Sequence, residues 1–316
     1  MRVLITGGFG FVGGRLAQHL HQAGHHVVLG SRTVRSPPQW LREAEVVKMD
    51  WNNIEALEAV CVGLDVIIHA SGMNAQDSFA SPAGALAVNG VATADLLSAG
   101  CKTGVKRFIY LSTAHVYNSP LEGSITEETC PRNLHPYATS HRAGEVAVLY
   151  ATQRKQIEGI VLRLSNAFGA PAHADANCWM LLVNDLCRQA VSLGSMTLRS
   201  SGFQRRDFIT LHDLSRVIAH ITDLSNAQTI EGVFNVGSGN SSRILDMVEL
   251  IQSRCTEVLG HTPEIIRPQP AIDEQNSNLH YRVDKLLYTG FSLSNDLAFE
   301  IDQTLHMCAD LREEGS

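Results

Sequence analysis

Two groups of residues have types and spacings that could do chemistry. Gly7, Gly10 and Gly13 stand between a short apolar run and an amphipathic segment. Glycines at this spacing permit a tight turn and let the backbone approach a pyrophosphate, which the first N–H groups of a following helix would hold. Tyr137 and His141 are four residues apart, so a helix places this phenol and this imidazole on one face. The first group predicts a phosphate-binding turn, and the second brings two titratable side chains together.

The elements that must position these residues alternate through the first half of the chain. Expected strands lie at 2–6, 27–29, 46–49, 65–68, 108–111 and 160–162, and expected helices at 11–23, 54–62, 83–99 and 137–153. Short apolar strands alternating with helices predict βαβ units and a parallel sheet that is buried on both faces. The expected fold is therefore α/β, with a doubly wound, Rossmann-like parallel sheet.

The second half of the chain departs from this alternation after residue 163. A length of 316 residues suggests about two domains. We expect the dinucleotide-binding domain at 1–164, with return segments at about 207–238. A smaller C-terminal substrate lobe is expected at 165–206 and 239–316, with helices at 242–259 and 294–312.

Composition limits the partners and the compartment. The net charge of −7, from 25 basic and 32 acidic residues, argues against a nucleic-acid partner. There is no unbroken run of about 18 apolar residues, so no membrane span is expected. The seven cysteines show no zinc-ligand spacing, which predicts no metal site and favours a reduced, cytoplasmic location.

Several motifs together resemble the extended branch of the short-chain dehydrogenase/reductase superfamily. Residues 6–13 are similar to its T-G-x-x-G-F-I-G turn, and 69–72 to its H-x-A-[AG] segment. Further similar segments are N-G-V-A-T at 89–93, R-x-x-N-x-x-G at 163–169, R-D-F-I at 206–209 and F-N-V-G at 234–237. The resemblance covers nearly the whole chain and implies a nucleotide-sugar epimerase, dehydratase or reductase that uses a nicotinamide cofactor.

The residues expected to bind the cofactor follow from the turn and from the resemblance. They are Gly7, Phe9, Gly10, Phe11, Val12, Gly13, Ser31, Arg32, Asp50, Trp51, Ala70, Ser71, Gly72, Asn89, Tyr137 and His141. An acid about 20 residues beyond the glycines selects NAD, but Ser31 and Arg32 stand there instead. Both could hold a 2′-phosphate, which predicts NADP, with NAD as the alternative. Arg32 could also be a solvated turn residue, and Asp50 a helix cap for the segment from Trp51 onward.

The resemblance implies a catalytic set of Thr113, Tyr137 and His141, with Tyr137 as the acid/base. The family has lysine where this chain has His141. We favour His141 as a working substitute for lysine; the alternatives are lost catalysis with cofactor binding retained, or histidine itself as the acid or base. With a reference pKa near 6.5, an imidazole is charged in roughly a quarter of molecules at pH 7. A second Y-x-x-x-K spacing at 281–285 is rejected, because it follows no suitable strand and no serine or threonine partner.

The expected reaction depends on what stands beside Thr113. Dehydratases of the resembled family have carboxylates there, whereas this chain has Ala114 and His115. The expectation is therefore C4 epimerisation or reduction of a 4-keto sugar. The alternatives are a reductase of a non-nucleotide ketone and an NADP-binding sensor without turnover. The expected substrate-binding residues are Asn74, Ser112, Thr113, His115, Asn166 and Arg206.

The resemblance also implies a homodimer. Members of the family commonly pair through the helices expected here at 83–99 and 137–153. Val146, Ala147, Leu149 and Tyr150 place apolar side chains around more than one face of the second helix, which is more than one core contact requires.

Overall fold

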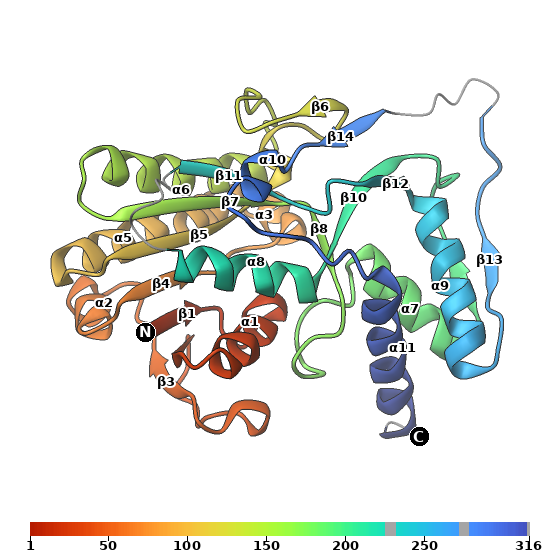
Figure 1. The fold of residues 1–316 in the computed structure, drawn as a ribbon, viewed down its shortest axis with the longest axis horizontal. Helices are drawn as coiled ribbons and strands as arrows, with labels where there is room; N and C mark the ends of the chain where they lie inside the picture. Colours follow the sequence, from red (N-terminus) through yellow and green to blue (C-terminus); the bar gives the residue numbers. More distant parts are fainter. Residues whose placement is uncertain (225–231, 272–277, 315–316) are drawn as a thin grey trace.

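A seven-stranded parallel sheet forms the centre of the protein. The computed structural model describes residues 1–224, 232–271 and 278–314. The strand order is β3-β2-β1-β4-β5-β7-β11 (Figure 1). The strands are β1 (Arg2–Thr6), β2 (His26–Ser31), β3 (Glu45–Lys48), β4 (Val66–His69), β5 (Arg107–Thr113), β7 (Glu158–Leu164) and β11 (Gly232–Val236). This confirms the predicted doubly wound α/β fold, in which the chain runs outward from β1 in both directions.

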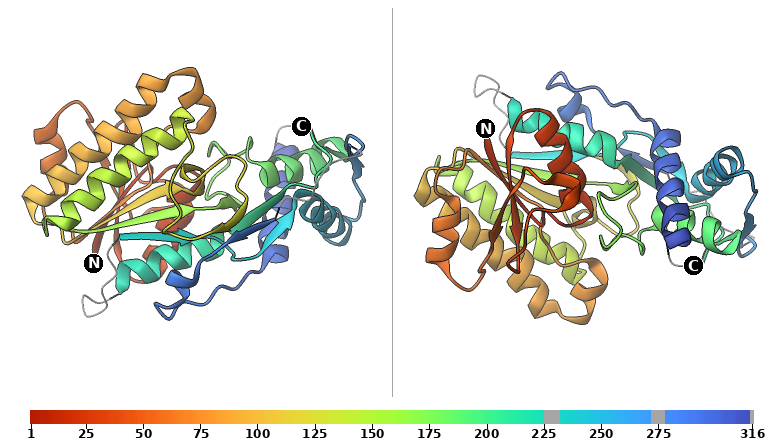
Figure 2. Two further views of the ribbon diagram at one scale, coloured as in Figure 1. Left: turned by 90° about the horizontal axis from the view of Figure 1, so that it is seen from above. Right: turned by 90° about the horizontal axis from the view of Figure 1, so that it is seen from below.

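Helices cover both faces of this sheet (Figure 2). On one face lie α1 (Phe11–Gln22) and α8 (Leu211–Asp223), and on the other α2 (Ile54–Cys61), α5 (Ala92–Thr103) and α6 (Pro136–Gln153). Successive strand side chains point to opposite faces, so Val3 and Ile5 pack with the first pair of helices and Leu4 with the other three. Both faces are buried, which explains why the strands are predominantly apolar.

One helical stretch, Pro82–Thr103, differs from its prediction as a plain helix at 83–99. It runs for 22 residues through α4 (Pro82–Ala85), a π-helical segment (Leu86–Val91) and α5. By length and composition alone it could cross a membrane, although polar residues interrupt its apolar sequence. In this fold 44% of its most apolar stretch is buried, and it packs against α2 and α6.

A second, smaller layer of structure adjoins the carboxyl end of the large sheet. Its strands β8 (Asn166–Phe168), β10 (Arg205–Thr210) and β12 (Ser241–Arg243) form one sheet, and β9 (Ser195–Thr197) pairs with β13 (Glu264–Ile266). Helices α7 (Leu182–Leu193), α9 (Ile244–Leu259) and α11 (Leu297–Glu314) pack around a hydrophobic core of their own, at the right in Figure 1. The domain limits given above stay a prediction.

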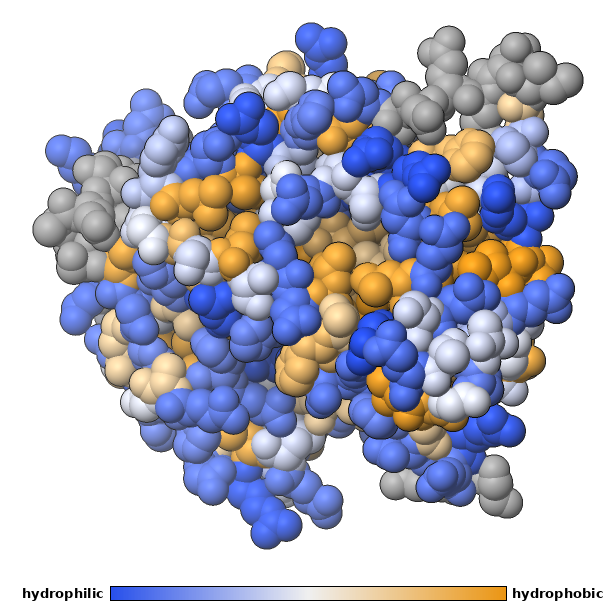
Figure 3. Space-filling model, turned by 45° about the vertical axis from the view of Figure 1, so that its right-hand side comes forward, coloured by the Kyte–Doolittle hydropathy of each residue, from blue (hydrophilic) through white to orange (hydrophobic). Residues whose placement is uncertain are grey.

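Short elements complete the described chain. They are α3 (Ala75–Ala80), α10 (Asp284–Leu287), the 3-10 turns Gln39–Leu41 and Ala114–Val116, and the paired strands β6 (Gly123–Ile125) and β14 (Leu279–Tyr281). Figure 3 shows that hydrophobic side chains reach one face in patches bordered by hydrophilic ones. Hydrophobic side chains scattered singly over a surface are normal in folded proteins.

Candidate active site

The glycine turn joins β1 to α1. Gly7 has a φ of +66°, and its carbonyl oxygen accepts a hydrogen bond from the Gly10 N–H at 2.8 Å. A Cβ at Gly13 would lie 2.2 Å from that carbonyl oxygen, so only glycine fits there. Gly10 is the N-cap of α1, and no side chain of the described residues caps it. The first N–H groups of α1, which include those of Phe11 and Val12, are therefore suited to an anion, and the turn fits a dinucleotide pyrophosphate.

Thr6 fixes the loop after β4 beside this turn. Its hydroxyl oxygen accepts hydrogen bonds from the N–H groups of Ala70 and Ser71, each at 3.2 Å, and from the Ser71 hydroxyl at 2.9 Å. Residues 70–72, which were predicted to bind the cofactor, thus lie next to the end of β1. Thr6 itself was not among the predicted site residues, because its role depends on a contact 64 residues away in sequence.

Asn89 connects this loop to α6. Its side-chain oxygen accepts from the Met73 N–H at 2.7 Å, and its side-chain nitrogen donates to the Ser140 hydroxyl at 3.0 Å. The residue is buried in the π-helical segment. A predicted cofactor residue is therefore bonded within the protein, where it holds the loop next to the start of α6.

A second loop joins the glycine turn to the smaller lobe. His173 donates from Nε2 to the carbonyl oxygen of Phe9 at 2.8 Å, and its ring stacks on Trp40 at 5.8 Å between ring centroids. Arg35 places its guanidinium 5.0 Å from the centre of the Phe9 ring. Trp40 and His173 were not predicted as site residues, since nothing in the local sequence relates them to a turn more than 25 residues away.

The residues expected at the adenosine end lie at the carboxyl ends of β2 and β3. Ser31 is buried and accepts from the Thr33 N–H at 3.3 Å, whereas Arg32 is exposed. Asp50 accepts from the Asn52 N–H at 3.3 Å. It does not cap a helix, because α2 begins at Ile54 and Asn53 is its N-cap, so that alternative for Asp50 is wrong. The Trp51 ring centroid lies 5.8 Å from that of His69.

The three predicted catalytic residues meet where β5 ends and α6 begins. Thr113 is the last residue of β5, and Tyr137 and His141 lie on the first two turns of α6. The rings of Tyr137 and His141 are edge-to-face, with centroids 4.6 Å apart. The Thr113 side chain lies close enough to the Tyr137 hydroxyl to lower its pKa. The Tyr137 N–H donates to Nδ1 of His135, which caps α6 and fixes the position of the phenol.

Burial determines the protonation of this set. It raises the pKa of Tyr137 above 10, and the nearby Thr113 side chain opposes that shift only in part. Burial also lowers the pKa of His141 to about 4, although Glu145 acts to raise it. At pH 7 this imidazole is therefore largely neutral, so the expectation that a quarter of molecules carry its charge is wrong. The packing of α6 against the end of the sheet, which the residue type alone does not predict, buries this imidazole.

Glu145 does not pair with His141 because it forms a buried ion cluster. It accepts from Nε and Nη2 of Arg163 at 2.9 and 2.7 Å, and from the Ser112 hydroxyl at 2.6 Å. Arg142 also donates to it, at 2.5 Å. The hydroxyl of Ser112, predicted to face the substrate, is therefore bonded within the interface between β5 and α6.

The remaining predicted substrate residues lie on four segments. His115 follows β5, and burial together with the positive charge of Arg206 lowers its pKa. Asn166 begins β8 and donates to the Asp207 carbonyl oxygen at 2.9 Å. Asn74 instead caps α3, accepting from the Asp77 N–H at 2.8 Å. Their roles toward a substrate stay predictions.

The rejected second Y-x-x-x-K spacing lies elsewhere. The Tyr281 hydroxyl donates to the Arg163 carbonyl oxygen at 2.7 Å, and Nζ of Lys285 donates to the carbonyl oxygen of Val233 at 2.8 Å. Neither side chain belongs to the group around Tyr137.

Comparison with known proteins decides the family. The sequence model of the NAD dependent epimerase/dehydratase family matches residues 3–237, about three quarters of the chain. The chain belongs to this family. It is an enzyme of the extended short-chain dehydrogenase/reductase type, as the motifs predicted.

The relatives of this chain are named for different reactions. The chain is 26% identical over 281 residues to a dTDP-glucose 4,6-dehydratase of Streptomyces niveus, covering 84% of this chain and 81% of that protein. It is 24% identical over 296 residues to a UDP-glucose 4-epimerase of Halalkalibacterium halodurans, covering 86% and 85%. A solved UDP-glucuronic acid 4-epimerase of Bacillus cereus, in complex with UDP-glucuronic acid and NAD, superposes with a TM-score of 0.80 at 22% identity. That match covers 98% of this chain and all of the other.

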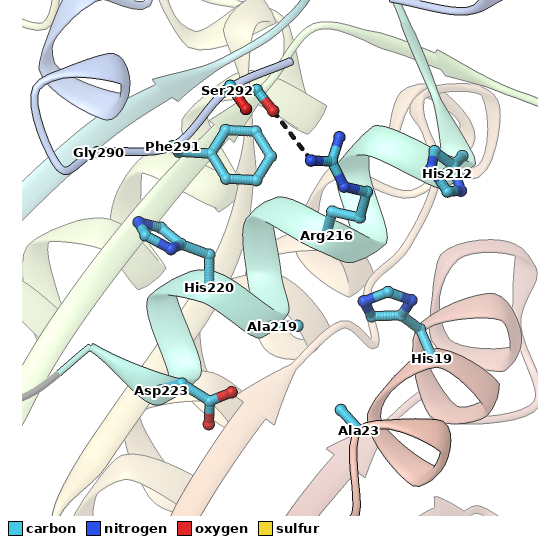
Figure 4. Close-up of a pocket in the computed structure, with 10 residues that line it drawn as sticks. All are labelled: His19, Ala23, His212, Arg216, Ala219, His220, Asp223, Gly290, Phe291 and Ser292. Atoms are coloured by element: carbon cyan, nitrogen blue, oxygen red, sulfur yellow. Dashed lines mark hydrogen bonds between the residues drawn. The ribbon is translucent and has the colours of Figure 1, made fainter. Parts of the chain in front are cut away.

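A pocket of about 590 Å³ lies apart from the residues grouped around Tyr137 (Figure 4). It is formed between α1, α8 and residues 290–292, and three histidines line it: His19, His212 and His220. Arg216 donates there to the carbonyl oxygen of Ser292 at 3.1 Å. None of the predicted site residues lines this pocket, so it has no part in the chemistry around Tyr137.

Proposed function

We propose that this protein catalyses an NAD(P)-dependent change at C4 of a nucleotide sugar, by keto-reduction or by epimerisation. The observation that carries the proposal is the juxtaposition of Thr113, Tyr137 and His141 next to a loop that Thr6 and Asn89 hold beside the glycine turn. The relatives support the substrate class, because their names include dTDP- and UDP-sugar enzymes.

Each residue has a distinct part in the proposed reaction. The backbone from Gly7 to Gly13 would hold the pyrophosphate, and a bound nicotinamide would supply hydride chemistry. Tyr137 gives or takes the proton of the C4 oxygen. The Thr113 hydroxyl oxygen accepts a hydrogen bond from the His115 N–H at 3.2 Å. The hydrogen of the Thr113 hydroxyl therefore remains available to the phenol or to the reacting oxygen.

The protonation of the site favours reduction. Tyr137 has a raised pKa and therefore stays protonated at neutral pH, as a proton donor to a carbonyl must be. His141 is neutral and adds no charge that would help tyrosinate to form. Epimerisation needs the phenol to act as base and acid in turn, so it benefits less from this arrangement.

The residues beside Thr113 support a C4 reaction over dehydration. Elimination needs an additional acid and base, and Ala114 and His115 supply no carboxylate. Dehydratases are among the relatives, so products of elimination must be measured together with those of C4 chemistry.

The test is a panel of dTDP- and UDP-hexoses and their 4-keto forms, each with NAD(H) or NADP(H). Products would be identified by NMR, and cofactor oxidation would be followed by absorbance. We expect a C4 epimer or a reduced 4-keto sugar from at least one substrate. A protein that binds a cofactor but converts no sugar would refute the proposal and favour a sensor; conversion of simple ketones alone would favour a non-nucleotide reductase.

We propose that NADP binds more tightly than NAD, although the B. cereus structure holds NAD. No acid follows β2, and the exposed Arg32 stands beside Ser31. Arg32→Ala should weaken NADP binding by roughly ten- to a hundredfold and leave NAD binding unchanged, because only NADP has a 2′-phosphate. Calorimetric titration measures both, with Arg42→Ala as the control. Tighter binding of NAD than of NADP by the parent protein would contradict this.

We propose a homodimer formed through α6 and the helix that ends in α5. These neighbouring helices expose Val91, Val146 and Tyr150, with 59%, 53% and 59% of their surfaces accessible. Light scattering at micromolar concentration should give twice the mass of the chain, and Val146→Glu should give single chains because it places a charge in the apolar interface. A parent protein of single-chain mass would refute the dimer.

We also propose a reducing, cytoplasmic location. All seven cysteines are free, as in proteins of reducing compartments. Cell fractionation of the host would test this, and recovery in an oxidising compartment would contradict it.

A further inference from the structure

Tyr110 is a buried tyrosine whose hydroxyl contacts His141. It lies within β5, 1% exposed, and its hydroxyl oxygen is 2.9 Å from Nδ1 of His141. The opposite edge of the imidazole faces Gly72, where a Cβ would lie 3.6 Å from Cε1 and 3.7 Å from Nε2. The two ring nitrogens of His141 thus have different surroundings: Nδ1 has a protein partner, and Nε2 faces the loop after β4.

A chain of hydrogen bonds ends at the Asn89 carbonyl oxygen, which lies near the Tyr110 hydroxyl. Because the Thr6 hydroxyl oxygen accepts from the loop after β4, its hydrogen is directed to Nδ1 of His69, 2.7 Å away. The neutral His69 ring then has its hydrogen on Nε2, which donates to the Thr93 hydroxyl at 3.0 Å. Thr93 in turn donates to the Asn89 carbonyl oxygen at 2.8 Å.

Tyr110 has one hydroxyl hydrogen, and two acceptors lie within hydrogen-bond distance of it: the Asn89 carbonyl oxygen and Nδ1 of His141. The Thr93 hydroxyl is also a neighbour, but its own hydrogen is on the Asn89 carbonyl oxygen. The Asn89 carbonyl oxygen is 3.2 Å away and already accepts from Thr93. Nδ1 of His141 is nearer and has no other partner among the described residues. We propose that Tyr110 donates its hydrogen to Nδ1 of His141 and so fixes the imidazole with its one hydrogen on Nε2.

This assignment makes Tyr110 a positioning residue for the proposed reaction, on which the inference rests. A neutral imidazole with hydrogen on Nε2 presents one donor toward the loop at Gly72, in the ring that packs against Tyr137. The opposite tautomer would present a lone pair there and repel an oxygen acceptor. Tyr110 thus determines whether a neutral His141 can donate to a hydroxyl oxygen, as the ammonium of a lysine would.

The test is the protonation of each His141 ring nitrogen, measured by NMR of the protein with ¹⁵N-labelled histidine. His141→Asn identifies the signals among those of the 14 histidines. We expect hydrogen on Nε2 in the parent protein and a mixture of tautomers in Tyr110→Phe. Tyr117→Phe is the matched control, since Tyr117 is another buried tyrosine whose hydroxyl donates to Asn235 at 2.7 Å, and it should leave the signals unchanged. Hydrogen on Nδ1 in the parent, or unchanged signals in Tyr110→Phe, would overturn the proposal.

A kinetic cycle separates positioning from a general structural effect. Tyr110→Phe should lower kcat/KM by roughly three- to tenfold in the parent and have little effect in a His141→Lys background, where no tautomer remains to be fixed. An equal loss in both backgrounds would contradict the positioning role. The NMR measurement needs no substrate, so absence of nucleotide-sugar turnover would refute the proposed function and leave the tautomer assignment to be decided separately.

Discussion

Tyr137→Phe is expected to lower kcat by a factor of about 10² to 10⁴, because it removes the group that transfers a proton at the C4 oxygen. The ring would keep its contact with His141, whose centroid is 4.6 Å away, so the fold and cofactor binding should be retained. Steady-state kinetics on the substrate found in the panel, together with calorimetric titration of the cofactor, measures both effects.

Tyr288→Phe is the control for this change. Tyr288 is 89% exposed and belongs neither to the proposed site nor to the proposed dimer surface, so its variant should keep the parent kcat. A Tyr137→Phe protein with the parent rate would show that another group transfers the proton.

Glu145→Ala is expected to destabilise the fold by about 3–5 kcal/mol, because it leaves the buried Arg163 guanidinium without its charge partner. Glu145 is fully buried and Arg163 is 2% exposed. Urea unfolding measures the difference. The control is Asp284→Ala, which removes the carboxylate of the exposed ion pair with Arg282 and should cost below about 1 kcal/mol. Equal small losses in both variants would show that the cluster contributes little.

The effect of Glu145 should depend on pH in a defined direction. Burial alone would raise the pKa of this carboxyl, but the hydrogen bonds and charge of Arg163 outweigh it and hold the pKa below 4.5. A lowered pKa in the folded state means that the contribution to stability is complete above pH 4.5 and decreases as the pH falls through the folded-state value. The parent and Glu145→Ala unfolding curves should therefore converge in acid; a constant difference down to pH 3 would contradict this.

Local sequence was sufficient for residues whose role depends on a turn or on helical spacing. Gly7 and Gly13 are required by a positive φ and by a close approach within one turn, and both features follow from the motif itself. Tyr137 and His141 share a face because they are four residues apart on α6. The alternation of strands and helices likewise predicted the parallel sheet.

Residues whose role depends on distant contacts could not be found in this way. Tyr110 meets His141 across 31 residues, and Thr6 meets the loop after β4 across 64. Such contacts depend on which strands are neighbours and in what register. The charge of His141 was mispredicted for the same reason, since the packing of α6 against the sheet, rather than the residue type, determines its burial.

Transfer of deuterium at C4 tests the central claim most directly. The best substrate of the panel would carry deuterium at C4, or the reduced cofactor would carry it at the nicotinamide, and mass spectrometry of a single turnover would locate the label. The account predicts that the label moves between sugar C4 and the nicotinamide, and that Tyr137→Phe slows this transfer. A label that remains in place while the sugar is converted would contradict hydride transfer at C4.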